Sequence, residues 1–290
     1  MKVLVAVKRV VDYKVQIRVK SDNSGVETQN VKMSVNPPDE NAIEEAVKLK
    51  EQGIANETIA ISIGDDKCQD VLRTSMAMGI DRSILIKSPN ALEPLAVAKT
   101  LKKIIEKEKP DLVLMGKQAI DDDSNQTGQI LSALMNWPQG CFISNLKIEG
   151  QKVFISREID EGIENLETTL PAVLTCDLRL NTPRFASLPN IMKAKKKPLE
   201  SIEIESLDID TDAKIAECKI DKRVCTTVRD GYLAAIVDLK KVIDKRDTFI
   251  SDHVVDTLAR AYALEVKTNI ELTKKVSRSV TSHLTKVTYG

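Results

Sequence analysis

The 290-residue sequence has few of the residues that are typical of disulfide, metal or membrane chemistry. Its five cysteines are dispersed without a C-x-x-C pair, which argues against a disulfide framework and favours a reducing compartment. The two histidines, His253 and His283, come late and far from the cysteines, so they do not indicate a zinc site. No apolar run approaches the ~20 residues of a membrane span. We find neither a signal peptide nor a cleavable Arg- and Ser-rich presequence before the first aliphatic run.

A net charge is also absent. The 43 basic residues and the 43 acidic residues balance, so no global field attracts the chain to nucleic acid or to an acidic membrane. Charge that matters must therefore be local, and the sequence has one basic run, with Lys193, Lys195, Lys196 and Lys197. We expect no nucleic-acid partner and no membrane insertion.

Short aliphatic runs alternate with segments of helical spacing through the first 135 residues or so. We expect strands at 3–7, 58–63, 83–86 and 112–115, and helices at 40–51, 69–78, 95–106 and 125–135. This alternation predicts an α/β fold, a parallel sheet flanked by helices. Because ligands in that architecture bind beyond the carboxyl ends of the strands, the candidate loops are those after Val7, Ile63 and Met115.

The pattern changes after Cys141. Segments 146–149, 152–159 and 164–169 alternate polar and apolar residues, which predicts an antiparallel meander. Residues 172–176 are aliphatic enough for another buried strand.

The remaining third of the chain is less regular. Two prolines argue against a regular element within 177–192, so we expect a long exposed loop that leads into a helix at Lys193. The acidic segment 199–212 indicates a connector. Segments 232–243 and 254–274 have helical periodicity.

A polar loop, residues 116–129, follows the fourth expected strand and opens a helix. A helix N-terminus has unpaired N–H groups and a partial positive charge, so it can hold a phosphate. Ser124 or Asn125 is the expected cap, and Asn125, Gln126 and Thr127 are expected to donate hydrogen bonds. The loop lacks both G-x-G-x-x-G and G-K-[ST], which favours nucleotide binding over phosphoryl transfer.

The same loop has a second interpretation, a solvated capping turn. Asp121, Asp122 and Asp123 lie in it, and three carboxylates near a phosphate are electrostatically unfavourable. Residue types alone leave both interpretations open.

Several longer motifs resemble one known family. They are VAVKRV (5–10), Asn36-Pro37, EEAV (44–47), GKQAIDDD (116–123), NQTGQ (125–129), WPQG (137–140) and LPNIMKAKKK (188–197). Over roughly residues 1–207 the chain resembles the electron-transfer flavoprotein beta subunits, nearest the mitochondrial and alphaproteobacterial type. The resemblance implies an adenine-nucleotide alpha-hydrolase-like α/β domain over 1–207. It ends before 208–290, where we expect a divergent, helical C-terminal arm.

The resemblance also implies a heterodimer with an alpha subunit, in which that subunit holds most of the FAD and this chain binds AMP. Tyr13 corresponds to an aromatic residue that approaches the flavin, and an ordinary surface tyrosine is the alternative. The positions that correspond to the family's AMP contacts are Ala6, Asn36, Pro37, Pro38, Asp39, Ile63, Gly116, Lys117, Gln118, Ala119, Ile120, Asp121, Asp122, Asp123, Ser124, Asn125, Gln126 and Thr127.

Residues 177–197 resemble the family's recognition loop, in which a leucine enters an apolar pocket on acyl-CoA dehydrogenases. Leu188 would act as a small hot spot and the lysines after it would steer encounter with an acidic partner. The alternatives are a satellite core residue and a solvated face. Lys193 and Lys196 also correspond to positions that can be methylated in mitochondrial members. The expected docking residues are Arg184, Leu188, Pro189, Ile191, Met192, Lys193 and Lys196.

The implied function is electron transport from acyl-CoA and related dehydrogenases of fatty acid beta-oxidation, through FAD, to a quinone oxidoreductase. The flavin supplies the chemistry, so no catalytic residue is expected in this chain. Two alternatives are an AMP-binding module without a redox role and a bifurcating variant that binds its own FAD in place of AMP. The AMP-type loop at 121–125 disfavours the second. The expected location is the mitochondrial matrix, with a bacterial cytoplasm as the alternative.

Overall fold

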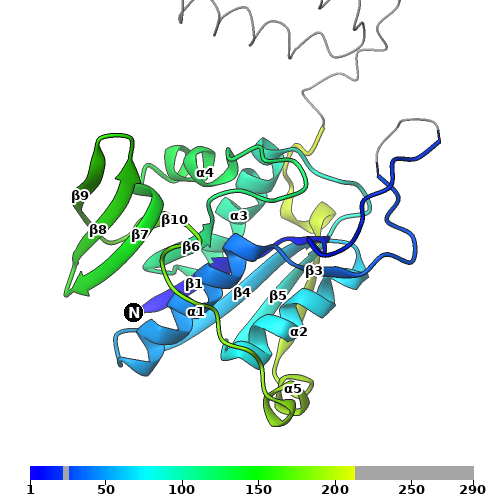
Figure 1. The fold of residues 1–290 in the computed structure, drawn as a ribbon, viewed down its shortest axis with the longest axis horizontal. Helices are drawn as coiled ribbons and strands as arrows, with labels where there is room; N and C mark the ends of the chain where they lie inside the picture. Colours follow the sequence, from blue (N-terminus) through cyan, green and yellow to red (C-terminus); the bar gives the residue numbers. More distant parts are fainter. Residues whose placement is uncertain (22–25, 213–290) are drawn as a thin grey trace, which may run out of the picture. The chain divides into compact units, whose positions relative to one another are not determined.

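The computed structural model describes residues 1–21 and 26–212, and this part of the chain is built around one large sheet (Figure 1). The order of its nine strands is β11-β5-β4-β1-β6-β10-β7-β8-β9. Six of them form its parallel part, β1 (Lys2–Ala6), β4 (Glu57–Gly64), β5 (Arg82–Lys87), β6 (Leu112–Gly116), β10 (Ala172–Cys176) and β11 (Leu199–Glu203). The antiparallel meander is β7 (Gln139–Glu149), β8 (Lys152–Ile159) and β9 (Gly162–Thr169), with β7 parallel to β10. The predicted α/β fold is confirmed.

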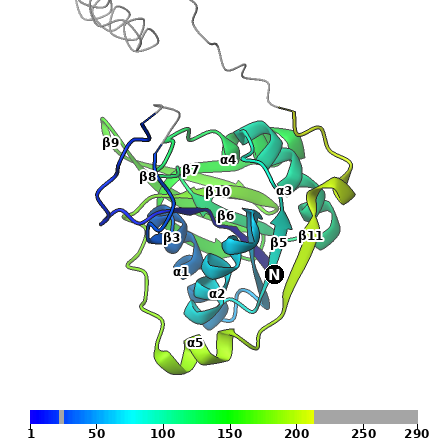
Figure 2. The ribbon, with the colours of Figure 1, turned by 90° about the vertical axis from the view of Figure 1, so that its right-hand side faces the viewer.

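Helices cover both faces of the parallel part (Figure 2). One face carries α1 (Pro37–Glu51) and α2 (Gln69–Met78), and the other carries α3 (Pro94–Glu108) and α4 (Thr127–Met135). Short elements complete the described part, namely η1 (Asp66–Cys68), η2 (Ile204–Leu207), α5 (Leu188–Ala194) and a small antiparallel pair, β2 (Arg9–Val11) and β3 (Met33–Val35).

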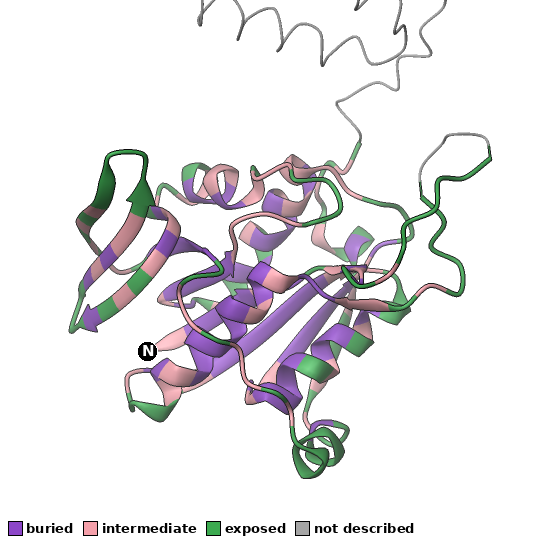
Figure 3. Ribbon diagram, viewed as in Figure 1, coloured by how far each residue is buried: buried purple, intermediate pink, exposed green. Residues whose placement is uncertain are grey.

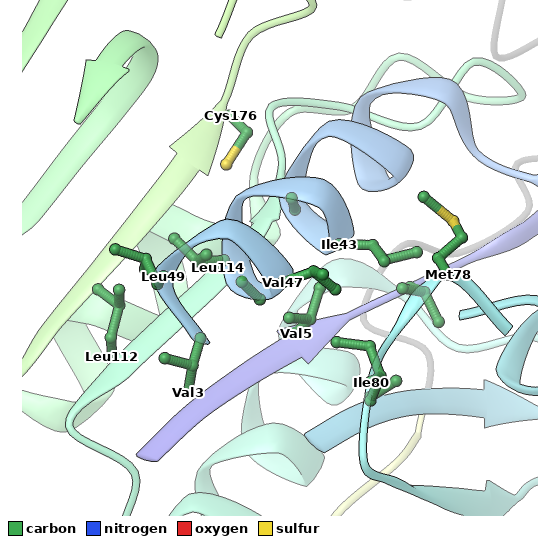
Figure 4. Close-up of a cluster of buried hydrophobic side chains, with 14 of the residues drawn as sticks. Val3, Val5, Ile43, Val47, Leu49, Met78, Ile80, Leu112, Leu114 and Cys176 are labelled. Carbon is green, nitrogen blue, oxygen red and sulfur yellow. The ribbon is translucent and has the colours of Figure 1, made fainter. Parts of the chain in front are cut away.

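The core explains why the strands read as continuous aliphatic runs. The central strands are buried on both faces, as the colouring in Figure 3 shows. In Figure 4, Val3 and Val5 of β1 lie against Ile43 and Val47 of α1, and all four side chains are buried. Alternate residues of the same strand, such as Leu4, pack against the helices of the opposite face. The two faces therefore need apolar residues at most positions of the central strands.

Strand order places a topological switch point between β1 and β6. From β1 the chain moves outward through β4 and β5, and it then returns to the other side of β1 as β6. Open α/β sheets bind ligands at the carboxyl ends of the strands where the order reverses. The ends of β1 and β6, near Ala6 and Gly116, form that position here.

Three sequence-based expectations are corrected. Helix α1 begins at Pro37 and not after the prolines, because the first helical turn needs no N–H groups from Pro37 or Pro38. Residues 188–194 form a helix, although none was expected before Lys193. The Ser187 side chain caps it by accepting the N–H of Asn190, and its proline again lies in the first turn.

The third correction concerns the expected connector at 199–212. Residues 199–203 form β11, which pairs with β5 at the edge of the large sheet. An edge strand pairs with one neighbour only and is less buried, so β11 needs no continuous aliphatic run. Its sequence therefore shows only a weak strand pattern.

Most of the predicted C-terminal arm lies outside the described residues, including the expected helices at 232–243 and 254–274 and both histidines. Among the residues that the structure does describe, no helix combines the length and the apolar character needed to cross a membrane.

We predict that Gly79→Ala lowers the free energy of unfolding by about 2–4 kcal/mol, from backbone strain and overpacking together. Gly79 ends α2 with φ +144, and a Cβ there would lie 2.8 Å from Cγ1 of the buried Val47. Urea unfolding followed by circular dichroism measures the loss. The matched control is Gly53→Ala, since Gly53 has φ +74 but nothing within 4 Å of a Cβ. Equal losses in the two variants would contradict the packing argument.

Candidate functional site

The carboxylate of Asp39 lies at the switch point and joins three elements. Its Oδ2 accepts the backbone N–H of Lys8 at 2.7 Å, just after β1, and its Oδ1 accepts that of Gly116 at 2.9 Å, at the end of β6. The residue stands in the first turn of α1 and is 5% exposed. Burial raises the pKa of Asp39 to about 7, although both backbone hydrogen bonds oppose the rise. One buried side chain thus ties two strand ends to the start of a helix.

Gly116 makes room for that carboxylate. A Cβ at this position would lie 2.3 Å from Oδ1 of Asp39 and 2.7 Å from Cβ of Pro38. Any larger residue would displace α1 from the end of β6, so the glycine follows from this close approach.

Asn36 shapes the loop that follows β6. Its side-chain amide donates to the carbonyl of Gln118 at 2.9 Å, and its Oδ1 accepts the N–H of Ile120 at 3.1 Å. Its own backbone N–H donates to the carbonyl of Lys8. The buried side-chain amide of Asn36 therefore supplies hydrogen bonds to backbone groups of the loop, which is not paired in a sheet.

Lys8 pairs with the acidic run of the loop. Its ammonium donates to Asp121 at 2.8 Å and to Asp122 at 3.0 Å. Burial opposes the charged form, yet these two carboxylates raise the pKa of Lys8 above its ordinary value. Asp123 is occupied as well, because its Oδ1 accepts the side-chain amide of Gln118 at 2.9 Å. Sequence reasoning missed the role of Lys8, whose only signal was its place directly after a strand.

Helix α4 begins at Thr127, and the side chain of its N-cap residue, Gln126, makes no capping hydrogen bond. The expected cap by Ser124 or Asn125 is wrong. Asn125 has φ +49, and its Oδ1 accepts the side-chain amide of Gln129 at 3.1 Å. Within the described part, the buried Oε1 of Gln129 has no hydrogen-bond partner. The first turn of α4 thus keeps backbone N–H groups that no capping side chain occupies.

The other expected nucleotide contacts lie around the same edge of the sheet. Ala6 ends β1, Ile63 lies near the end of β4, and Pro37 and Pro38 start α1. The loop residues Lys117, Ala119 and Ile120 complete the group. Tertiary structure therefore brings together segments that are up to about 110 residues apart in the sequence. Tyr13 is exposed and lies just after β2.

Lys117 connects this edge with the expected recognition loop. Its ammonium donates to Asp177 at 2.8 Å, and its backbone N–H donates to the carbonyl of Cys176. Burial works against ionisation of Asp177, but the neighbouring Lys117 contributes to a pKa below the ordinary value. The loop after β6 and the segment after β10 are thereby joined.

Helix α5 lies beyond the end of α2 (Figure 1). Several of its apolar side chains are exposed to solvent. Leu188 is 77% exposed, Met192 is 70% exposed and Ile191 is 40% exposed. Phe185, three residues before the helix begins, is 99% exposed and was missed from the sequence, where only its aromatic character in a proline-flanked loop marked it. Pro189 is exposed too.

The basic run divides into two groups. Lys193, Lys195 and Lys196 are exposed. Lys197 turns inward and donates to the carbonyls of Met76 at 2.9 Å and Ile80 at 2.6 Å, and burial lowers its pKa. Only the first three lysines are available to an incoming surface.

Arg184 makes intramolecular hydrogen bonds to Glu44 and Glu51 on α1. Its contact with a partner protein stays a prediction. Across residues 1–21 and 26–212 we find no group of three His, Cys, Asp or Glu side chains arranged to hold a metal ion.

We predict that Asp39→Asn lowers the free energy of unfolding by about 1–3 kcal/mol at pH 5, because one amide oxygen cannot serve both N–H groups. Urea unfolding measures this loss. Asp160→Asn is the control, since Asp160 is exposed in a turn and its change is expected to stay within about 0.5 kcal/mol. A loss at position 39 no larger than this would refute the bridging role of the carboxylate.

The pH dependence follows from the raised pKa. The folded chain binds the Asp39 proton more tightly than the unfolded chain, in which the pKa of this carboxyl is near 3.8. The contribution of this group to stability is therefore full at low pH and is lost as pH rises from about 4 through 7. We expect the stability difference between the wild type and Asp39→Asn to shrink over that range. A difference that grows with pH would contradict the assignment.

Comparison with known proteins identifies the family. The family model described as electron transfer flavoprotein domain matches residues 24–207. The electron transfer flavoprotein subunit beta of Bradyrhizobium diazoefficiens is 55% identical over 219 residues, which cover 76% of this chain and 88% of that protein. The mitochondrial subunit of Arabidopsis thaliana is 55% identical over 250 residues, covering 84% and 97%. The human subunit is 54% identical over 225 residues, covering 76% and 88%.

The family match over residues 24–207 includes the described helices, the strands of the large sheet except β1, and the expected docking residues. Among the expected cofactor contacts, Ala6 and Tyr13 lie before it. With its α/β fold and more than half of its residues identical to those of several such subunits over the matched region, the chain belongs to the electron transfer flavoprotein beta subunits, of the type found in Bradyrhizobium and in mitochondria.

Proposed function

We propose that this beta subunit binds AMP at the switch point and docks acyl-CoA dehydrogenases through α5. Electrons would pass through FAD, held mostly by the alpha subunit, to a quinone oxidoreductase. Membership of the family makes the chain one subunit of an electron carrier, with an alpha subunit as its partner. The single observation that carries the docking proposal is the exposure of Leu188 on a capped helix beside three exposed lysines.

The loop after β6 fits an adenine nucleotide in its donor set. The first turn of α4 offers backbone N–H groups without a capping side chain, together with the hydroxyl of Thr127, and these suit a phosphate. Ser124 adds a second hydroxyl in the same loop. Ala6 and Ile63 supply backbone atoms at the ends of the adjacent strands.

The electrostatic objection to a phosphate near three aspartates is weaker in the folded chain. Lys8 pairs with Asp121 and Asp122, and Asp123 accepts a hydrogen bond from Gln118. These carboxylates serve to hold the loop, while the helix N-terminus remains for the ligand. In this proposal Asn36 and Asp39 act mainly by fixing the loop, since their side chains are used by backbone groups.

Bound flavin would supply the redox chemistry, and this chain would contribute contact and orientation. Tyr13 is the residue through which we propose that contact, because it is exposed and lies on the same segment as β2. We place the protein in the mitochondrial matrix, with a bacterial cytoplasm as the alternative, because the named relatives include both mitochondrial and bacterial subunits.

The first test is the identity of the nucleotides released when the purified heterodimer is denatured. We expect one AMP and one FAD per heterodimer. FAD in place of AMP would favour a bifurcating subunit. AMP without any flavin, together with AMP affinity in the isolated chain, would favour a binding module with no redox role.

We predict that Leu188→Ala raises the KM for a reduced acyl-CoA dehydrogenase about 10-fold, as the loss of a hot-spot side chain would. AMP and FAD content should not change, because α5 is anchored beside the end of α2, before β5 starts, and the switch point lies at the carboxyl ends of β1 and β6. Electron transfer is followed by reduction of the flavin in the heterodimer. Ile163→Ala is the control, since Ile163 is a comparably exposed aliphatic residue on β9, at 69%. An unchanged KM in Leu188→Ala would remove the docking proposal.

A further inference from the structure

We infer that Arg184 is a positioning residue that ties the start of the docking segment, residues 185–193, to α1, and that Arg73 ties the other end of the segment to α2. The two arginines would keep Leu188 and its apolar neighbours in one binding-competent arrangement. This inference rests on the proposed docking of dehydrogenases, since it concerns how the docking surface is held.

The guanidinium of Arg184 bridges two carboxylates on α1. It donates to both oxygens of Glu44, from Nε at 2.8 Å and from Nη2 at 2.9 Å. It also donates to both oxygens of Glu51, from Nη1 at 2.5 Å and from Nη2 at 2.9 Å. Glu44 and Glu51 are seven residues apart and so share one face of the helix. The planar fork of arginine suits this double contact, and the point charge of lysine does not.

The ion pair between Arg184 and Glu44 is costly to break because Glu44 is buried. Glu44 is almost fully buried, although it is charged, and its Oε2 also accepts the backbone N–H of Arg184 at 3.1 Å. A buried carboxylate that loses its partner is costly, and removal of the guanidinium takes away the partner of Oε1, because the backbone N–H of residue 184 reaches Oε2. Nearby, Asn181 donates to Glu45 at 2.9 Å and to the carbonyl of Asn41 at 3.0 Å. The segment before α5 is thus fixed along the outer face of α1.

The opposite end of α5 is fixed to α2 by a reciprocal pair of helix C-terminal contacts. Nη1 of Arg73, on α2, donates to the carbonyls of Ala194 at 2.7 Å and Lys197 at 2.8 Å. Lys197 in turn donates to the carbonyls of Met76 and Ile80 at the end of α2. Basic side chains satisfy the last carbonyls of both helices in this way.

Between the anchors at Arg184 and Arg73, α5 itself makes few stabilising contacts. It has seven residues, and a helix of that length is unstable in isolation. Most of its side chains are exposed, and Ala194 at its end is its buried residue. The conformation of Leu188 therefore depends on the anchors. If only a fraction of molecules has the competent arrangement, the apparent dissociation constant rises by the inverse of that fraction.

The test compares arginine variants in the purified heterodimer. We expect Arg184→Ala to raise the KM for a reduced acyl-CoA dehydrogenase about 5- to 10-fold, with kcat changed less than about 2-fold, because the competent fraction falls and the flavin is untouched. The matched control is Arg82→Ala. Arg82 also bridges two glutamates, Glu57 and Glu108, but it lies at the start of β5. An unchanged KM in Arg184→Ala, with a raised KM in Leu188→Ala, would overturn the positioning role and leave the proposed docking intact.

Two further variants separate positioning from direct contact with the partner. Glu51→Gln leaves Arg184 in place and removes one carboxylate, so we expect the KM to rise about 2- to 3-fold. Arg184→Lys keeps the charge but not the fork, so its KM should lie between those of the wild type and Arg184→Ala. Wild-type KM values in both variants would show that bridging is not needed and would overturn the inference.

Hydrogen exchange gives a readout that does not depend on any dehydrogenase. We expect the amides of 186–192 to exchange at least about 5-fold faster in Arg184→Ala than in Arg82→Ala, because local opening is easier without the anchor. Equal exchange rates in the two variants would refute the positioning role, whatever the docking assays show.

Discussion

The rest of the structure depends on the burial of helix α1 on two sides. Its apolar side, with Ile43 and Val47, packs against the central strands. Its polar side is covered by residues 177–187, so that Glu44 and Asn41 are buried as well. Charged and amide groups can be buried only when hydrogen bonds replace the water that they lose. The covering segment is therefore held where those partners are supplied.

Both proposed sites are connected through this helix. Its first turn carries Asp39, which fixes the ends of β1 and β6 beneath the proposed nucleotide loop. Its last two turns carry the carboxylates that hold Arg184 and the docking segment. A second connection runs from Lys117 to Asp177. The proposed nucleotide loop and the docking segment are thus fixed to the same rigid element, which is a physical reason why the AMP that we propose there would act as a structural ligand.

Sequence patterns predicted the parallel sheet, the meander and the edge at which the expected nucleotide contacts meet. They did so because strands buried on both faces must be mainly apolar, and the buried residues of β1 (Val3, Leu4, Val5) and of β6 (Leu112 to Met115) are all apolar. The patterns failed for α5 and β11, where the burial is slight and the periodicity is correspondingly weak. They also assigned Ser124 or Asn125 as a helix cap, although the chain turns twice through positive φ, at Asp123 and Asn125, before α4 begins.

The sequence by itself determined the fold class and the family motifs, because both depend on residue types at short spacing. Tertiary structure alone decided which polar side chains are used in intramolecular hydrogen bonds and ion pairs and which remain available to ligands. Lys8, Asp39, Lys197 and Arg184 look like surface or site residues in the sequence, yet each is paired with groups far away along the chain. The physical reason is that a charged group near the core must find its partner in three dimensions, and local sequence does not record that partner.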